Sequence, residues 1–160
     1  YSSMRLSLHT DYALRVLMFL AGAGRRCTVS EITEFYKISR DHVAKVTARL
    51  ARSGYIRALR GAGGGLEMAR AAEEICVGKV VAEFEGTLQL LECVTAEEII
   101  CRIQPGCKLR HVLAKAEKVQ RDYLDSVHLS DVIKPGQSLE KMTKYKLRNT
   151  NPKKRKKPLC

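Results

Sequence analysis

The sequence contains no tryptophan, and aromatic residues make up only 6% of its 160 residues. Proteins that bind single-stranded nucleic acid stack bases on aromatic side chains, so this scarcity argues against that kind of binding. No run of 18 apolar residues occurs, which excludes a transmembrane helix and predicts no membrane contact. The first residues lack the order of charged, apolar and small residues that marks a secretory signal. We expect the native chain to begin at Met4, with residues 1–3 foreign to it.

The charge of +12 is unevenly distributed along the chain. Residues 1–70 carry 12 basic and 5 acidic groups, residues 71–133 carry 7 and 11, and residues 134–160 carry 10 and 1. A basic N-terminal half beside an acidic middle predicts one module that faces nucleic acid and one that faces something else. The alternative is a basic surface that is simply solvated.

Helical periodicity and capping residues predict three helices near the start of the chain. We expect them over 11–21, 29–37 and 40–53, opened by Thr10, Thr28 and Ser39. The last two are short and separated by a turn, which is typical of a helix-turn-helix. The outward face of the third helix is mainly basic, as a helix that enters a major groove should be: Arg40, Asp41, His42, Lys45, Arg49 and Arg52. A solvated amphipathic helix would have the same pattern.

A glycine-rich β-hairpin is expected directly after the third helix. Residues 55–60 and 66–70 are strand-like, and the tip between them is Gly61-Ala62-Gly63-Gly64-Gly65. A basic hairpin after a recognition helix is the wing of a winged helix, and Arg60 at its base is placed to reach a phosphate or a narrow minor groove. A glycine-rich tip can also cradle a nucleotide phosphate, but the helix context and the lysine of such loops are missing here.

Six cysteines are present, and three of them follow the pattern Cys93-x7-Cys101-x5-Cys107. Clustered cysteines in an intracellular chain favour metal or redox chemistry over disulfides. No Cys-x-x-Cys pair occurs, which argues against a zinc ribbon and a thioredoxin-like dithiol. Three thiolates on one irregular loop suit a soft cation or a metal cluster and leave a fourth position open or filled by another group. The alternative is three ordinary buried thiols.

A long helix is predicted over 108–133, because apolar residues recur there at helical spacing. They are Leu109, Val112, Leu113, Ala116, Val119, Tyr123, Leu124 and Val127. A two-fold partner is the usual cover for such a stripe, although packing on its own domain is the alternative. Residues 134–160 are polar and basic, so we expect a disordered tail. This tail could bind DNA non-specifically or act as a nuclear-import signal in a eukaryote.

Four segments together resemble the winged-helix iron–sulfur transcriptional repressors of the NsrR and IscR family, most of all its nitric-oxide-sensing members. They are MRLSLHTDYALR (4–15), ISRDHVAKV (38–46), RGAGGGL (60–66) and the three-cysteine loop. The resemblance covers Met4 to Ile133 and predicts a mainly α fold with a small β-hairpin. It implies a winged-helix domain over 4–86, a cluster-binding loop over 87–107 and a dimerisation helix over 108–133, in a homodimer of the bacterial cytoplasm.

The same resemblance implies a set of ligands for the cluster. In the nitric-oxide sensors three cysteines hold a 4Fe-4S cluster, which assigns Cys93, Cys101 and Cys107 here, although a 2Fe-2S cluster remains an alternative. The fourth ligand would be Asp11 of the other subunit. As an alternative, the helix dipole alone favours an acid in a first turn. His111 is the second choice, because it follows Cys107 by one residue more than the ligand histidine of IscR-like relatives.

The implied partners are a double-stranded DNA operator and nitric oxide as the signal. Operator contacts are expected from Ser39, Arg40, His42, Lys45, Arg49, Arg60, Gly63 and Gly64. Asp41 and Lys37 depart from the family pattern, which commonly has asparagine and a turn glycine there. No Ser-His-Asp or paired-carboxylate arrangement is evident, so we expect a repressor and not an enzyme. The alternatives are a 2Fe-2S regulator of cluster assembly, a zinc-stabilised regulator, and an enzyme with a cysteine nucleophile.

Overall fold

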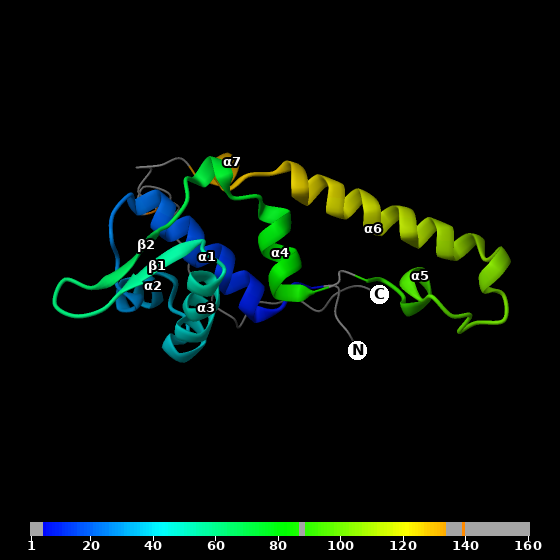
Figure 1. Cartoon of the computed structure of the whole chain (residues 1–160), viewed down its shortest axis with the longest axis horizontal. Helices are drawn as coiled ribbons and strands as arrows, with labels where there is room; N and C mark the ends of the chain where they lie inside the picture. Colours follow the sequence, from blue (N-terminus) through cyan, green and yellow to red (C-terminus); the bar gives the residue numbers. More distant parts are fainter. Residues whose placement is uncertain (1–4, 87–88, 134–138, 140–160) are drawn as a thin grey trace, which may run out of the picture.

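The computed structural model describes residues 5–86, 89–133 and 139, and its elements are helices apart from one two-stranded hairpin (Figure 1). In chain order these are α1 Leu8–Ala23, α2 Val29–Tyr36, α3 Arg40–Arg52, β1 Ile56–Leu59, β2 Gly65–Met68, the 3-10 helix η1 Ala72–Glu74, α4 Val77–Glu85, α5 Glu92–Thr95, the 3-10 helix η2 Gln104–Gly106, α6 Lys108–Ser126 and α7 Leu129–Val132. The predicted fold class, mainly α with a small hairpin and a long C-terminal helix, is confirmed. The tail predicted over 134–160 lies outside the described residues, apart from residue 139.

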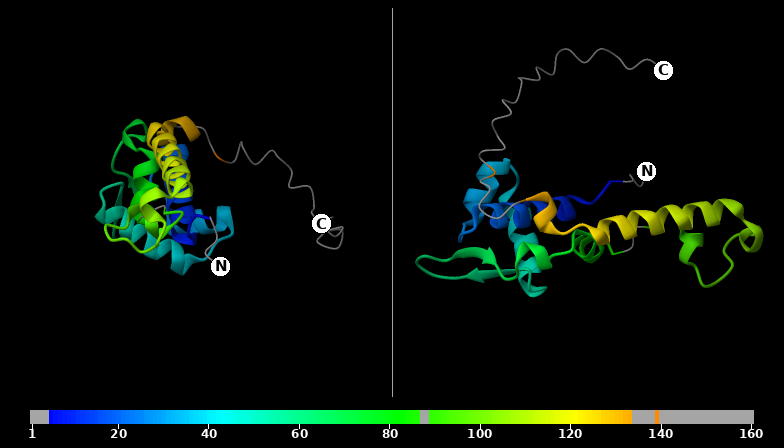
Figure 2. Two further views of the ribbon diagram at one scale, coloured as in Figure 1. Left: turned by 90° about the vertical axis from the view of Figure 1, so that its right-hand side faces the viewer. Right: turned by 90° about the horizontal axis from the view of Figure 1, so that it is seen from above.

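The molecule is extended along α6. α1, α2, α3 and the hairpin gather at one end, and α6 runs away from them on the side opposite the hairpin (Figure 2). α5 and the segment that carries the three cysteines lie beside the distal half of α6, which α5 contacts. The fold therefore separates the expected DNA-binding elements from the cysteine loop by most of a long helix.

The core of the winged-helix domain lies between α1, α3 and the elements around them. Val16, Leu17 and Leu50 have no exposed surface, and each such side chain contributes about 1.5–3 kcal/mol of burial free energy. The buried residues of α1 and α3 recur at the helical spacing that the sequence predicts. The capping box of Thr28 and Glu31 opens α2 as expected.

The first helix begins earlier than predicted. Ser7, not Thr10, is its N-cap, because the Ser7 hydroxyl accepts a hydrogen bond from the Thr10 backbone amide. Thr10 is fully buried, and its hydroxyl donates to Glu85 at the end of α4. A threonine that would suit a cap thus serves as a contact between two helices.

The long helix ends before the predicted residue 133. α6 stops at Ser126, and the next residues pair with the start of α4: Val77 N donates to Val127 O at 2.8 Å, and Leu129 N donates to Ile75 O at 2.8 Å. Leu129 is fully buried and Ile133 is 2% exposed, both in the core of the winged-helix domain. The chain therefore returns to this domain after α6. The helix ends at Ser126 because the backbone groups of Val127 and Leu129 bond to residues 77 and 75 and not to a further helical turn.

The hairpin has the register Ile56↔Met68 to Leu59↔Gly65, and an isolated bridge between Cys27 and Leu66 ties it to the end of α1. Its tip closes on itself, since Gly64 N donates to Gly61 O at 2.9 Å. A Cβ on Gly64 would lie 2.9 Å from that same carbonyl oxygen, so the tip tolerates no side chain there.

Candidate nucleic-acid interface and metal centre

The exposed part of α3 carries basic side chains that are free to reach outward. Arg40 and Lys45 are exposed, and neither side chain bonds to any residue that the structure describes. Ser39, at the N-cap, is also exposed and makes no side-chain capping bond. These three residues lie where the sequence places the surface that contacts DNA.

His42 and Arg49 are engaged within the domain. The ring of His42 is half-buried, with its centroid 5.9 Å from the ring of His9 and 6.2 Å from that of Tyr12 on α1. Its Nδ1 is buried and has no hydrogen-bond partner among the described residues. The guanidinium of Arg49 donates to Glu83 O and lies 4.6 Å from the ring centroid of Phe84 on α4. Both side chains hold α3 against its neighbours, and their contacts with DNA stay predictions.

The wing presents Arg60 and Gly63 as exposed residues, with Gly64 half-buried beside them. It is braced by Arg26, which the sequence analysis did not single out. Arg26 Nη1 donates to Gly63 O at 2.9 Å, and Nη2 lies 3.0 Å from Glu67 Oε2. Arg26 is about 40 positions from Gly63 and Glu67, and no local sequence pattern connects residues that far apart, so these bonds could not be predicted from the sequence.

The three clustered cysteines differ in their surroundings. Cys93 lies in α5 and is half-buried, Cys101 is exposed, and Cys107 is the half-buried N-cap of α6, where its Sγ accepts a hydrogen bond from Arg110 N at 3.4 Å. All three are free thiols, as are the buried Cys27 and Cys76. Among the described residues, no group of three His, Cys, Asp or Glu side chains is close enough to hold one metal ion.

The donor set nevertheless suits an iron–sulfur cluster. The three unpaired thiols lie on one segment with little regular structure, and sulfur donors that can move toward one another are what such clusters require. Cys27 and Cys76, by contrast, are buried in or beside the winged-helix domain, and burial raises the pKa of the Cys27 thiol. Cys93, Cys101 and Cys107 therefore have the chemistry that such a cluster needs, and their role as its ligands stays a prediction.

The two candidates for the fourth ligand lie on different elements, Asp11 on α1 and His111 on α6. Asp11 is in the first turn of α1, where its carboxylate pairs with Arg15 at 2.8 Å and keeps 41% of its side chain exposed. α1 packs mainly against α3 and α4 (Figure 1), and a link from Asp11 to the cysteine loop of a second chain stays a prediction. His111 is exposed on α6, one turn after Cys107.

Three polar side chains that the sequence did not single out shape the cysteine loop. Arg110 donates to the carbonyls of Cys93 and Val94, and Glu117, only 4% exposed, accepts from Leu90 N at 2.6 Å. Gln104, 5% exposed, accepts from Ile100 N at 2.9 Å and donates to Glu98 O at 3.2 Å. Glu117 interrupts the hydrophobic face of α6, which is the single sign of these contacts in the sequence.

The last turn of α4 is held by both α1 and α3. Ser53 donates from its hydroxyl to Glu83, and the Ser7 amide and the Thr10 hydroxyl donate to Glu85. Partial burial alone would raise the pKa of Glu85, but the hydrogen bonds from Thr10 and Ser7 outweigh it and lower the pKa. α4 is also the helix that precedes the cysteine segment, so one short helix bonds to α1 and α3 and continues toward the three cysteines.

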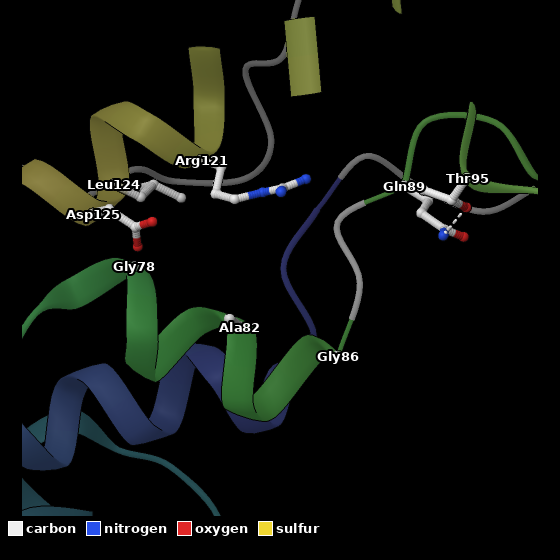
Figure 3. A pocket seen from close by; sticks show the side chains of 8 residues that line it. All are labelled: Gly78, Ala82, Gly86, Gln89, Thr95, Arg121, Leu124 and Asp125. Carbon is white, nitrogen blue, oxygen red and sulfur yellow. Dashed lines mark hydrogen bonds between the residues drawn. The ribbon is translucent and has the colours of Figure 1, made fainter. Parts of the chain in front are cut away.

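α4 and α6 meet closely at one point and separate beyond it. A Cβ on Gly78 would lie 2.7 Å from Asp125 N, so glycine is what allows the close approach. Toward the end of α4 the helices leave a cavity of about 360 Å³ (Figure 3). Its walls are Gly78, Ala82 and Gly86 of α4, Arg121, Leu124 and Asp125 of α6, and Gln89 and Thr95 of the cysteine segment.

The opposite face of α6 is an exposed apolar stripe. Leu109, Val112, Val119 and Tyr123 are each 59–68% exposed. They are three, seven and four residues apart, which places them on one face of the helix. Leu124 and Glu117, on the other side of the helix, face the cavity and the cysteine segment. α6 therefore has one face packed on its own chain and one apolar face in solvent.

No helix among the described residues is long and apolar enough to cross a membrane. The family profile described as "Rrf2: Iron-dependent Transcriptional regulator" matches residues 6–135. The HTH-type transcriptional regulator NsrR of Bacillus subtilis (strain 168) is 39% identical over 145 residues, which is 89% of this chain and 99% of that protein.

Solved structures have the same fold. The oxidised form of Staphylococcus aureus CymR superposes with a TM-score of 0.65 and 25% identity, over 81% of this chain and 96% of that one. IscR of T. potens superposes with a TM-score of 0.61 over 80% of this chain and 85% of that one, and at 22% identity the likeness concerns the fold alone.

Proposed function

Because the chain belongs to the Rrf2 family of iron-dependent transcriptional regulators, we propose that it is a repressor whose operator binding depends on an iron–sulfur cluster and responds to nitric oxide. The observation that carries this proposal is the set of three free thiols on one loop, joined through α4 to the recognition helix. As a member of a family of transcriptional regulators, the chain is not an enzyme, as the sequence predicts.

The DNA contacts are assigned to the two exposed parts of the winged helix. Arg40, Lys45 and Ser39 of α3 would contact base edges and phosphates in the major groove, and Arg60 with the glycine tip would follow the backbone or the minor groove. Two copies of α3 are needed to read a palindromic operator whose half-sites are about 34 Å apart. The exposed stripe of α6 supplies the surface through which two chains would pair.

The cluster would be held by Cys93, Cys101 and Cys107, with Asp11 of the second chain as the fourth ligand and His111 as the alternative. When bound, a 4Fe-4S cluster, or a 2Fe-2S cluster in the alternative, supplies iron that nitric oxide attacks. To serve as a ligand, Asp11 must leave its ion pair with Arg15, which is exposed enough to break at little cost. A ligand from α1 of one chain on the loop of the other would tie the two chains together at the metal centre.

The residues of the chain provide a route from the loop to the DNA. Movement of residue 89 and its neighbours would act first on α4, whose Glu83 and Glu85 are bonded to α3 and α1. A displaced α4 would shift Arg49 and with it the recognition helix, which changes the distance between the two copies of α3. Such a shift of population needs contacts that differ between the two states, and the bonds of α4 are the ones that we expect to differ.

The proposal is tested by replacing each cysteine with alanine and measuring iron and sulfide per chain after anaerobic purification. Cys93→Ala, Cys101→Ala and Cys107→Ala are each expected to lose the cluster, whereas Cys160→Ala is the matched control and should keep it. Operator binding by the loaded wild type should weaken when nitric oxide is added. Full iron in Cys101→Ala would contradict the assignment, and a colourless protein with one zinc and no sulfide would support the zinc-stabilised alternative.

A further inference from the structure

Arg110 contacts two of the three segments that carry the clustered cysteines. Its backbone amide donates to Cys107 Sγ at 3.4 Å, while its side-chain Nε donates to Cys93 O at 2.6 Å and Nη2 to Val94 O at 3.3 Å. The two cysteines are 14 positions apart in the sequence, and the Arg110 side chain ties the backbone at Cys93 to the first turn of α6, which Cys107 caps. A charged donor on two carbonyls makes a stronger link than neutral hydrogen bonds do.

The position of Arg110 has no explanation in the energetics of its own helix. It lies in the first turn of α6, where the positive end of the helix dipole disfavours a cation. The carbonyls that it binds belong to the last residues of α5, which have no partner within that four-residue helix. The hydrogen bonds to the two carbonyls of α5 therefore offset the unfavourable interaction of the Arg110 charge with the helix dipole.

Cys101 is not included in this link. It is exposed, and the bonds around it are those of Gln104 with Ile100 and Glu98, all within one short stretch of chain. Glu117 adds a second anchor from α6, but to Leu90, on the Cys93 side of the loop. The loop thus consists of a part fixed on α6, which carries Cys93 and Cys107, and an arm that carries Cys101.

We propose that Arg110 is a positioning residue that keeps the segments of Cys93 and Cys107 together when no cluster is bound, so that closure of the Cys101 arm completes the set of three thiols. This inference rests on the proposed function for its purpose, since it concerns the thiols assigned to the cluster. The geometry on which it stands belongs to the chain without metal.

The experiment uses the full chain without iron, reduced and kept under anaerobic conditions, with a short bis-maleimide as the probe. The initial rate of the Cys93–Cys107 cross-link is measured by peptide mass spectrometry in the wild type, Arg110→Met and Arg110→Lys. The matched control is Arg102→Met, since Arg102 is exposed beside Cys101 and bonds to none of the described residues. Modification of each thiol by a monofunctional maleimide is followed in parallel.

Arg110→Met should lower the Cys93–Cys107 cross-linking rate on the order of tenfold, which is what the loss of a charged hydrogen bond amounts to. Arg110→Lys should retain part of the rate, because an ammonium group can still donate to one carbonyl. Arg102→Met should match the wild type. Rates with the monofunctional reagent should stay level across all variants, so that the difference reports the separation of the thiols and not their reactivity.

An unchanged cross-linking rate in Arg110→Met, with a far-UV circular dichroism spectrum like that of the wild type, overturns the proposal. If Arg110→Met does not fold, Arg110→Gln takes its place and is held to the same result. The cross-link involves no iron, so its outcome is independent of the proposed function. Wild-type protein that fails to bind iron would refute the cluster and leave the positioning role of Arg110 standing.

Discussion

Lys37 is the one non-glycine residue with positive φ among the described residues, and its backbone conformation lowers the stability of the fold. Its φ of 53° places it in the left-handed region at the end of α2, immediately before the recognition helix. This conformation costs a residue other than glycine about 1–2 kcal/mol. Glycine would avoid that cost, but it would lose part of the gain because it is more flexible in the unfolded chain. The fold keeps the turn in spite of this cost.

Lys37→Gly is therefore expected to stabilise the chain by about 0.5–1 kcal/mol. Urea unfolding followed by circular dichroism measures the effect. Gly54→Ala is the matched control, because Gly54 also has positive φ, at 71°, and should respond with a loss of stability. A destabilised Lys37→Gly would show that the lysine side chain makes a contribution that its backbone angle conceals.

Glu85 predicts a specific dependence of stability on pH. Its hydrogen bonds from Thr10 and Ser7 lower its pKa from the ordinary value of 4.5, against the opposing effect of burial. The stabilisation is therefore complete above pH 4.5 and is lost as pH falls through the lowered pKa. Glu85→Gln should remove this component, with an effect of at most about 1 kcal/mol because solvent screens the carboxylate.

Unfolding free energies at pH 6 and at pH 3.5 check the prediction for Glu85. The difference between the two should be smaller in Glu85→Gln than in the wild type. Glu73→Gln, a change at an exposed residue of η1 whose side chain bonds to none of the described residues, is the control for a general effect of removing one charge. The prediction fails if both variants have the same pH dependence.

At the scale of elements, the crossing of α4 and α6 depends on Gly78. A methyl group there would meet the backbone of Asp125 and Leu124, which cannot move aside without shifting α6. Gly78→Ala should therefore destabilise the chain by about 1–3 kcal/mol, the usual cost of overpacking.

Thermal unfolding of Gly78→Ala measures this cost. Gly106→Ala, next to Cys107, provides the control because nothing lies within 4 Å of its added Cβ. If the two variants unfolded at the same temperature, the close approach of α4 to α6 would not hold in solution.

Local patterns in the sequence predicted the elements well and their long-range contacts poorly. The capping box of Thr28 and Glu31 and the glycine tip of the wing are local, and both lie where expected. The end of α6 at Ser126 was missed, because the apolar pattern continues through Val127 while the backbone there pairs with residues 75–77. The links made by Arg26, Arg49 and Arg110 were missed for the same reason, since each joins parts of the chain that no spacing rule connects.

At the scale of the whole molecule, the exposed stripe of α6 predicts association of two chains. Val119 and Tyr123 are 59% and 68% exposed, and pairing would remove both from water. Val119→Glu should weaken a dimer by more than tenfold, since it places an unpaired charge in an apolar interface. Sedimentation velocity over a range of concentrations gives the dissociation constant.

Lys118→Glu is the control for this prediction, because Lys118 is exposed beside the stripe and pairs with Asp122. It changes the charge of the helix in the same direction without entering the apolar face. If Val119→Glu and Lys118→Glu had the same dissociation constant, the exposed stripe of α6 would not be the surface through which two chains pair.

The return of the chain to the winged-helix domain after α6 has a consequence for how such a protein can evolve. The backbone pairing of residues 75–77 with 127–129 brings the beginning of α4 and the end of α6 together, so the cysteine segment and α6, which follow α4 in the chain, return to the domain beside the start of α4. Insertions, deletions or the loss of a cysteine in the segment between α4 and α6 leave this backbone pairing, and the core that contains Leu129 and Ile133, as they are. Natural selection can therefore alter the cysteine segment while the winged-helix domain is inherited unchanged.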